Sequence, residues 1–292
     1  MEKINRLGWA DGISFTTYGL RIGVRTNTPA ALEQLAAVLP PGWQPSGSPE
    51  VDRVYSLLVG GSGRQTHVRR YNLLYADAGR LTRSMTLDDV LARLEGDLRI
   101  YIAERARRRV FVHAGVVGWR GRAILIPGAS HSGKTSLVAA LVRAGATYYS
   151  DEYAVLDVRG RVHPFAVALS LRDGPHGEVR KRRAESLGGS SGVASLRVGL
   201  VAITTYQPGA RWRARPLSQG QAMLALLSHT VPARRRPRTA LATLRKVVTS
   251  AAVVKGVRGE AEQMCDALLS AAEPRASAGS VVDRPRNRVL AH

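Results

Sequence analysis

A glycine-rich segment near the middle of the chain holds the residues best suited to chemistry. The pattern G-x-x-x-x-G-K-[ST] is matched at every fixed position by Gly128-Ala129-Ser130-His131-Ser132-Gly133-Lys134-Thr135. Glycines in such a loop let backbone N–H groups turn towards one phosphate, and the next helix presents its positive end there. Lys134 would supply a cation to the β- and γ-phosphates, and the Thr135 hydroxyl would bind Mg²⁺.

The surroundings of this segment favour a phosphate loop over an ordinary glycine-rich turn. Residues 122–127 have the apolar composition of a buried strand, and residues 134–144 have the periodicity of a helix. Strand, loop and helix in this order are the context that the pattern requires. We therefore expect a nucleotide, ATP with Mg²⁺, to contact the loop and its helix as far as Ser136.

An acid pair follows the next predicted strand, residues 147–150. A carboxylate at the carboxyl end of a strand lies beside the phosphate loop in a parallel sheet. Asp151 is therefore expected next to the Mg²⁺ with Thr135, and Glu152 is expected beside it. The alternative is a turn at the strand end that carries solvated acids.

Three further residues are candidates for the site. His113 lies inside an apolar strand, residues 110–117, where a histidine alone is more often a hydrogen-bonded core residue. Arg172 and Arg258 are candidates for stabilising transferred charge, because a guanidinium can contact phosphate oxygens in a bidentate manner.

These features together resemble the catalytic domain of HPr kinase/phosphorylase and its relatives. The resemblance covers roughly residues 110–172 and includes His113, the loop, the helix end at residues 143–145 and the acid pair. It implies an α/β P-loop core related to phosphoenolpyruvate carboxykinase and a serine hydroxyl of a protein as the acceptor. It also implies that Asp151 assists proton transfer and metal binding, and that His113 lies near the γ-phosphate.

The sequence departs from this family in ways that bear on the acceptor. Asp151-Glu152 stands where the family usually has two aspartates, and His131 stands where it usually has glycine. The first hundred residues do not resemble the usual regulatory domain. Some small relatives beside peptide natural-product pathways phosphorylate a peptide serine, and such an acceptor suits this chain better than HPr.

The expected function is therefore that of an ATP-dependent kinase acting on a protein or peptide hydroxyl, with serine as the expected acceptor. Two alternatives stay open. One is a nucleotide-binding regulatory module that hydrolyses ATP slowly or not at all. The other is a nucleic-acid-binding protein with an accessory phosphate loop, whose binding would depend steeply on salt.

Composition bounds the partners. The chain of 292 residues has a formal charge of +21, and 38 of its 43 basic residues are arginine. This excess suits an acidic peptide, a nucleic acid or an anionic membrane surface. Its clusters are short and lack interleaved aromatic residues, which favours scattered surface charge over a single-strand binding surface. Nucleic acid therefore stays an alternative partner, and a homo-oligomer stays open.

A membrane-spanning, secreted or disulfide-bonded protein is not expected. No apolar run has the length of a membrane span, and the amino terminus lacks the apolar region of a secretory leader. Cys265 is the single cysteine, so a disulfide within the chain is excluded. We expect a cytoplasmic protein.

The predicted fold class is α/β, with a P-loop core and an additional N-terminal unit. Residues 1–85 read as a mixed α+β unit. Residues 86–273 form the predicted kinase-like domain, with a long helix over 86–109 as the connector. Residues 274–292 are rich in Arg, Ser, Gly and Pro and are predicted to be a disordered tail.

Overall fold

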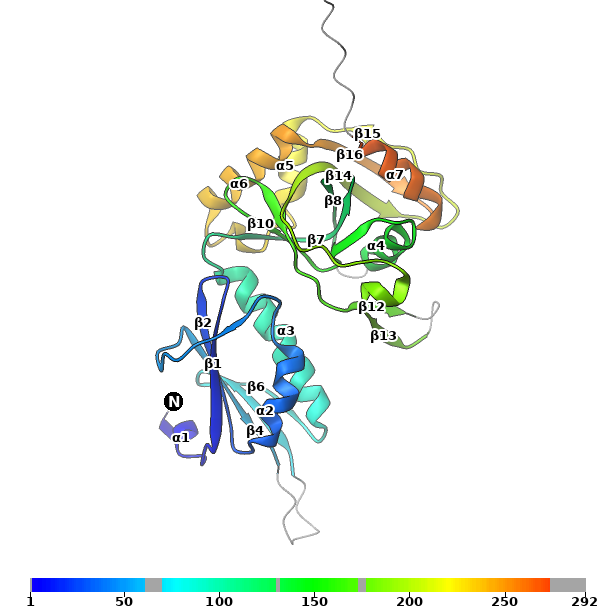
Figure 1. Ribbon diagram of the computed structural model, residues 1–292. Helices are drawn as coiled ribbons and strands as arrows, with labels where there is room; N and C mark the ends of the chain where they lie inside the picture. Colours follow the sequence, from blue (N-terminus) through cyan, green and yellow to red (C-terminus); the bar gives the residue numbers. More distant parts are fainter. Residues whose placement is uncertain (1, 61–69, 130–131, 173–176, 274–292) are drawn as a thin grey trace, which may run out of the picture.

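The computed structural model describes residues 2–60, 70–129, 132–172 and 177–273 (Figure 1). The chain has a mixed α/β fold, in agreement with the predicted class, and its described strands form sheets of six, eight and two strands. The predicted tail, residues 274–292, lies outside the described residues. No helix within the described ranges is long and apolar enough to cross a lipid bilayer.

The first sheet is built by the N-terminal part of the chain in the order β3-β1-β2-β4-β5-β6. Its strands are β1 (Asp11–Thr17), β2 (Leu20–Thr26), β3 (Gln44–Pro45), β4 (Arg53–Leu58), β5 (Asn72–Ala76) and β6 (Gly79–Ser84). Its helices are α1 (Glu2–Asn5), α2 (Ala30–Leu35), η1 (Ala36–Val38) and α3 (Leu87–Arg105). Tyr18 and Gly19, with φ of 48° and 79°, form the two-residue turn between β1 and β2. Such a turn matches the twist of a hairpin.

Helices α2 and α3 lie along the N-terminal sheet (Figure 1). The buried side chains of α3 recur at helical spacing, as in Val90, Leu94 and Leu98, and they share a core with Phe15 of β1. This core continues into the second sheet, where Phe111 belongs to the same cluster. The N-terminal sheet, α3 and the second sheet therefore share one apolar interior.

The second sheet has the order β11-β10-β7-β8-β14-β16-β15, and β9 also pairs with β7. Its strands are β7 (Val110–Trp119), β8 (Arg122–Pro127), β9 (Thr147–Ser150), β10 (Tyr153–Leu156), β11 (Arg161–His163), β14 (Leu196–Tyr206), β15 (Arg215–Pro216) and β16 (Ala252–Arg258). A separate hairpin consists of β12 (Leu169–Arg172) and β13 (Val179–Arg182). The remaining helices are α4 (Lys134–Arg143), η2 (Ala184–Leu187), α5 (Gln219–Leu227), η3 (Val231–Ala233), α6 (Pro237–Ser250), η4 (Glu262–Met264) and α7 (Cys265–Ala271).

Strand directions around the acid pair differ from the parallel arrangement that we expected. Strand β9, which precedes Asp151, pairs antiparallel with β7, and β7 pairs antiparallel with β8. Strands β8, β14 and β16 are parallel to one another. Because β8 and β9 are both antiparallel to β7, they run in the same direction and end at the same edge of the sheet. The acid pair thus lies at the loop's edge of the sheet, although the strands that position it are not parallel neighbours.

Helices cover both faces of the second sheet (Figure 1). Alternate residues of β8 supply the two cores, with Ile124 and Ile126 on one face and Ala123 and Leu125 on the other. The first face packs against α4 and α7, and the second packs against α5 and α6. Gly115 of β7 allows α4 to come close, since a side chain there would clash with it. The strand before the loop is therefore buried on both faces.

Several elements differ from the pattern read in the sequence. Helix α6 was not anticipated, and neither were β6 and the hairpin of β12 and β13. The last helical segment of the described chain begins as η4 and becomes α-helical only at Cys265. Helix α3 ends at Arg105, four residues before the predicted limit at residue 109. Ser218 and Gln221 form a capping box at the start of α5.

Candidate functional site

The glycine-rich loop (residues 128–133) connects the end of β8 to the first turn of α4. Gly133 is the N-cap residue of α4 and has a φ of 77°, a conformation that L side chains rarely adopt. A side chain at Gly128 would approach the Ser132 hydroxyl to 2.7 Å. Both glycines are therefore required by the path of the chain. Ser130 and His131, which we expected to contact the nucleotide, lie outside the described residues.

Lys134 is buried at the start of α4 and points back over the loop. Its ammonium donates a hydrogen bond of 2.6 Å to the Ala129 carbonyl, and its exposed fraction is 7%. Burial lowers its pKa, while the nearby charges of Asp151 and Glu152 raise it. Among the described residues, the Ala129 carbonyl is its one hydrogen-bond partner, and a buried ammonium with a neutral partner is costly unless an anion approaches it. The loop is thus prepared for a negatively charged ligand.

Thr135 and Asp151 are brought together from different elements. The Thr135 hydroxyl donates a 3.0 Å hydrogen bond to Oδ2 of Asp151, which follows the last residue of β9. The hydroxyl of Tyr148, within β9, lies 2.8 Å from Oδ1 of the same carboxylate and 2.8 Å from the Val167 carbonyl. Asp151 is therefore held on both oxygens and faces the first turn of α4.

The environment of Asp151 makes its carboxyl a better proton acceptor than a solvated aspartate. Burial raises its pKa, and the hydrogen bonds from Tyr148 and Thr135 lower it again, with burial dominating. A raised pKa means that the carboxylate holds a proton more readily at neutral pH. The residue thus combines a fixed orientation with increased basicity.

Glu152 belongs to a chain of charged groups rather than to a solvated turn. Its carboxylate accepts a 2.9 Å hydrogen bond from Arg99 of α3, and Arg99 also pairs with Glu95. Lys181 of β13 donates a 2.7 Å hydrogen bond to the other oxygen of Glu95. Burial raises the pKa of Glu152, whereas Arg99 lowers it. This network links α3, the acid pair and the hairpin of β12 and β13.

His113 of β7 and His229 lie near Lys134. The His113 backbone N–H donates a 2.7 Å hydrogen bond to the His229 carbonyl, and the His113 carbonyl accepts a hydrogen bond from Gly128. Burial lowers the pKa of His113 to about 4, with further contributions from Lys134 and His229. Its imidazole is therefore neutral at pH 7. A neutral imidazole can donate or accept a hydrogen bond beside the loop.

Arg258, at the end of β16, supports the glycine-rich loop. Its Nη2 donates hydrogen bonds of 3.2 and 3.0 Å to the carbonyls of Ser132 and Gly133, and its Nη1 donates one of 3.0 Å to the carbonyl of Gly259. The side chain is 2% exposed. Since its hydrogen bonds go to backbone carbonyls, Arg258 holds the shape of the loop in this structure. This differs from the direct contact with transferred charge that we expected.

Arg172 is the predicted site residue that the structure leaves apart. It is exposed on β12 and lines a cavity of about 500 Å³ together with Ser136 and Arg143. Within the described part of the chain, it forms no hydrogen bond or ion pair with Asp151 or Lys134. Ser136 of α4 is exposed and lines the same cavity.

A second cavity, of about 600 Å³, opens beside the acid pair. Its wall includes Tyr148 and Arg99, which contact Asp151 and Glu152, and also Lys181 of the hairpin. The opposite wall comes from the N-terminal unit and includes Trp43. A ligand in this cavity would therefore lie between the two sheets and next to the partners of the acids.

Sequence reasoning missed the residues that connect the site to other elements. Tyr148 could have been noticed, because a buried tyrosine needs a hydrogen-bond partner and an acid lies three residues further on. Nothing in the sequence pattern linked His229 or Arg99 to the loop, since both arrive through long-range packing.

Few of the described residues near the glycine-rich loop could hold a metal ion. Among the residues that the structure describes, no group of three or more His, Cys, Asp or Glu side chains could hold a metal ion. Mg²⁺ commonly uses only one or two carboxylates together with phosphate oxygens and water, so Thr135 and Asp151 fit it.

No known protein-family model matches the chain, and a search of curated proteins finds no match.

Proposed function

We propose that this protein is an ATP-dependent kinase that transfers the γ-phosphoryl group to a hydroxyl, expected to be serine, of a protein or peptide. The contact of 3.0 Å between Thr135 and Asp151 is the observation that carries this proposal. It joins the first turn of α4, directly after the glycine-rich loop, to the Asp151 carboxylate, whose pKa is raised by burial. We further propose that the second sheet is a P-loop core of the HPr kinase and phosphoenolpyruvate carboxykinase type, with the protein acting in the cytoplasm.

Nucleotide binding in this proposal rests on the loop and on Lys134. Gly128 and Gly133 let the backbone surround the phosphates, and the Lys134 ammonium would exchange its bond with the Ala129 carbonyl for the β- and γ-phosphates. Thr135 and Asp151 would hold Mg²⁺, which neutralises charge on the phosphates when it is bound. Arg258 holds the loop in this shape by donating hydrogen bonds to the carbonyls of Ser132 and Gly133.

The transfer itself needs one proton acceptor. The hydroxyl oxygen of the acceptor forms a bond with the γ-phosphorus while the bond from that phosphorus to the bridging oxygen of ADP breaks. Asp151 takes the hydroxyl proton, for which its buried carboxylate is positioned by the Thr135 hydroxyl. Tyr148 fixes the orientation of the carboxylate through its 2.8 Å contact. Neutral His113 is available to hydrogen-bond a phosphate oxygen beside Lys134.

The acceptor segment would enter through the cavity beside the acid pair. Its lining carries both signs of charge, and Arg99 and Lys181 are already paired with Glu95. Arg183, in the same lining, would pair with an acidic residue near the target hydroxyl. A hydroxyl placed there would approach Asp151 from the side of Tyr148. The N-terminal unit, through Trp43, would then contribute to acceptor choice.

Transfer of label tests the proposal directly. The purified protein is incubated with ATP labelled at the γ-phosphate, Mg²⁺ and a library of serine-containing peptides with acidic flanking residues. We expect label on a peptide serine, and we expect the label to be absent when Lys134→Ala replaces the wild type. Binding of ATP without any labelled peptide, protein or free phosphate would favour the regulatory module instead.

A further inference from the structure

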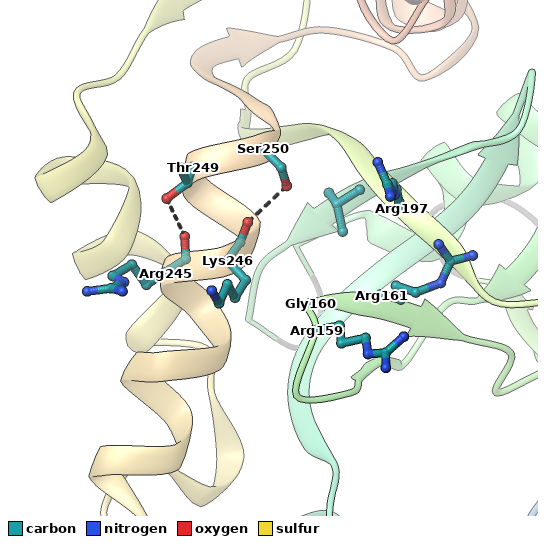
Figure 2. A pocket seen from close by; sticks show the side chains of 9 residues that line it. Arg159, Gly160, Arg161, Arg197, Arg245, Lys246, Thr249 and Ser250 are labelled. Carbon is teal, nitrogen blue, oxygen red and sulfur yellow. Dashed lines mark hydrogen bonds between the residues drawn. The ribbon is translucent and has the colours of Figure 1, made fainter.

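A third concave site lies between α6 and the second sheet (Figure 2). Its volume is about 580 Å³. Helix α6 forms one wall with Lys246, Thr249 and Ser250, and the strands form the other with Arg161 and Arg197 (Figure 2). The remaining lining residues are Arg159, Gly160, Val198 and Arg245. We refer to this concavity as the basic pocket.

The cations of the basic pocket have no acidic partner among the described residues. Within the described part of the chain, no carboxylate pairs with Arg159, Arg197 or Lys246, and the pocket lining includes no acid. Asp157 is the nearest acid along the chain, but its oxygens accept hydrogen bonds from the backbone N–H groups of Arg159 and Arg161 and contact His163. The positive charge of the pocket is therefore not neutralised by any residue that the structure describes.

Local structure brings the cations to one place. The Gly160 turn between β10 and β11 lies against α6, because a Cβ at this glycine would come within 3.0 Å of Lys246. The guanidinium of Arg161 is held by Ser195, with Nε donating a 3.0 Å hydrogen bond to the hydroxyl. Arg197 is paired with Arg161 across the strands β11 and β14. Placing like charges at such a cross-strand position is destabilising unless an anion binds there.

The basic pocket is separate from the proposed nucleotide site. Arg197 pairs with Arg122 at the beginning of β8, whereas the glycine-rich loop follows the end of the same strand. A strand of this length spans roughly 20 Å at about 3.3 Å per residue. An adjoining cavity that includes Arg122 extends the same positive surface. The basic pocket and the glycine-rich loop therefore lie at opposite ends of β8, and one phosphate chain could not fill both sites.

We propose that the basic pocket binds a compact ligand that carries several phosphate groups. Arginine forks match phosphate oxygens in a bidentate manner, and cations on facing walls can surround a small multivalent anion. Val198 is the one apolar side chain larger than a methyl group in the lining, and the lining contains no aromatic residue. The pocket therefore offers no stacking surface for nucleic-acid bases.

Inorganic tripolyphosphate is the probe for this site, and calorimetric titration is the measurement. The Lys134→Ala protein is used so that the glycine-rich loop does not contribute, which keeps the test independent of the proposed kinase activity. We expect tripolyphosphate to bind at physiological ionic strength. Replacing two cations of the pocket, Arg197→Ala with Lys246→Ala, should weaken binding by about tenfold or more, since each contributes a charged hydrogen bond.

A matched pair of substitutions controls for net charge. Arg211 and Lys255 are exposed and do not line the basic pocket, so Arg211→Ala with Lys255→Ala removes the same charge elsewhere. This pair should change the affinity by less than about threefold because distant exposed charges are screened. Equal losses in both double variants would overturn the proposal. So would pocket-dependent binding of a polyglutamate peptide or an RNA oligonucleotide by a protein that does not bind tripolyphosphate.

Discussion

The Thr135 hydroxyl donates a hydrogen bond of 3.0 Å to the Asp151 carboxylate, and the two residues are 16 positions apart in the chain. Thr135 is the second residue of α4, and Asp151 follows the last residue of β9. A hydroxyl and a carboxylate in contact are suited to share one Mg²⁺ with phosphate oxygens. Substitutions around this pair should therefore separate effects on nucleotide binding from effects on transfer.

Lys134→Ala should remove most nucleotide affinity. The substitution deletes a buried ammonium whose hydrogen-bond partner is the Ala129 carbonyl. Loss of charged hydrogen bonds to phosphate should weaken ATP binding by about ten- to a hundredfold. Calorimetric titration with Mg·ATP measures this change. Lys255→Ala, at an exposed lysine of β16, is the matched control and should bind as the wild type does.

Arg258→Ala should lower both stability and nucleotide affinity. It leaves the carbonyls of Ser132, Gly133 and Gly259 without their guanidinium donor. Hydrogen bonds to charged groups contribute about 1.5–3 kcal/mol, and we expect the free energy of unfolding to fall by at least that amount. Urea denaturation measures the change. An Arg258→Ala protein as stable as the wild type would show that the loop keeps its shape without this contact.

His113 should make the protein less stable in acid. Its pKa is lowered from 6.5 to about 4 by burial first, so the unfolded state binds more protons than the folded state between these values. The contribution of neutral His113 to the free energy of unfolding is therefore fully present above about pH 6.5, and it is lost as the pH drops towards about 4. His113→Gln should show a shallower fall in urea denaturation over this range. Parallel curves for the two proteins would contradict the assignment.

Local signals account for the parts of the site that could be predicted from the sequence. The loop, the helix of Lys134 and Thr135, and the strand before Asp151 each depend on residues close together in the chain. The turn at Gly133 needs a positive φ, and a glycine in the pattern supplies it. Such features follow from spacing and backbone sterics, so they can be read without knowledge of the fold.

Long-range packing accounts for the parts that could not be predicted. The antiparallel pairing of β9 with β7 could not be predicted because a strand's partner depends on the whole topology, whereas β8, β14 and β16 are parallel as expected. Arg258 reaches Gly133 although the two are 125 positions apart, since β16 lies beside β14. Helix α6 did have a local signal. Pro237 stands at its first turn, and its buried residues recur at helical spacing, but the neighbouring arginines obscured this pattern.

Tyr148→Phe should shift the pH dependence of transfer. The tyrosine hydroxyl bonds to Asp151 and thereby lowers its pKa, so removing the hydroxyl raises that pKa further. Because the base acts only when it is deprotonated, the acidic limb of the rate profile should move to higher pH. Rates measured across pH with saturating ATP give this shift. Tyr149→Phe, which removes a hydroxyl bonded to the Ala194 carbonyl instead, should leave the limb in place.

Asp151→Asn and Glu152→Gln should separate a kinase from a binding module. Asparagine keeps the size of the side chain and one acceptor oxygen for Tyr148, but it cannot take the proton. Binding of Mg·ATP should stay within about tenfold of the wild type, because Lys134 and the loop remain. Transfer should fall by about 10² to 10⁴, the usual contribution of a general base. Single-turnover measurements of labelled product report this loss.

Glu152→Gln tests the adjacent position with the same change of charge. Glu152 pairs with Arg99 in a network that reaches Glu95, so its loss should disturb the position of α3 more than the chemistry. We expect a smaller decrease in transfer than at Asp151, together with a lower free energy of unfolding. A binding module predicts no transfer in any of these proteins. If Asp151→Asn transfers phosphate at the wild-type rate, Asp151 is not the base, and His113 becomes the next residue to replace.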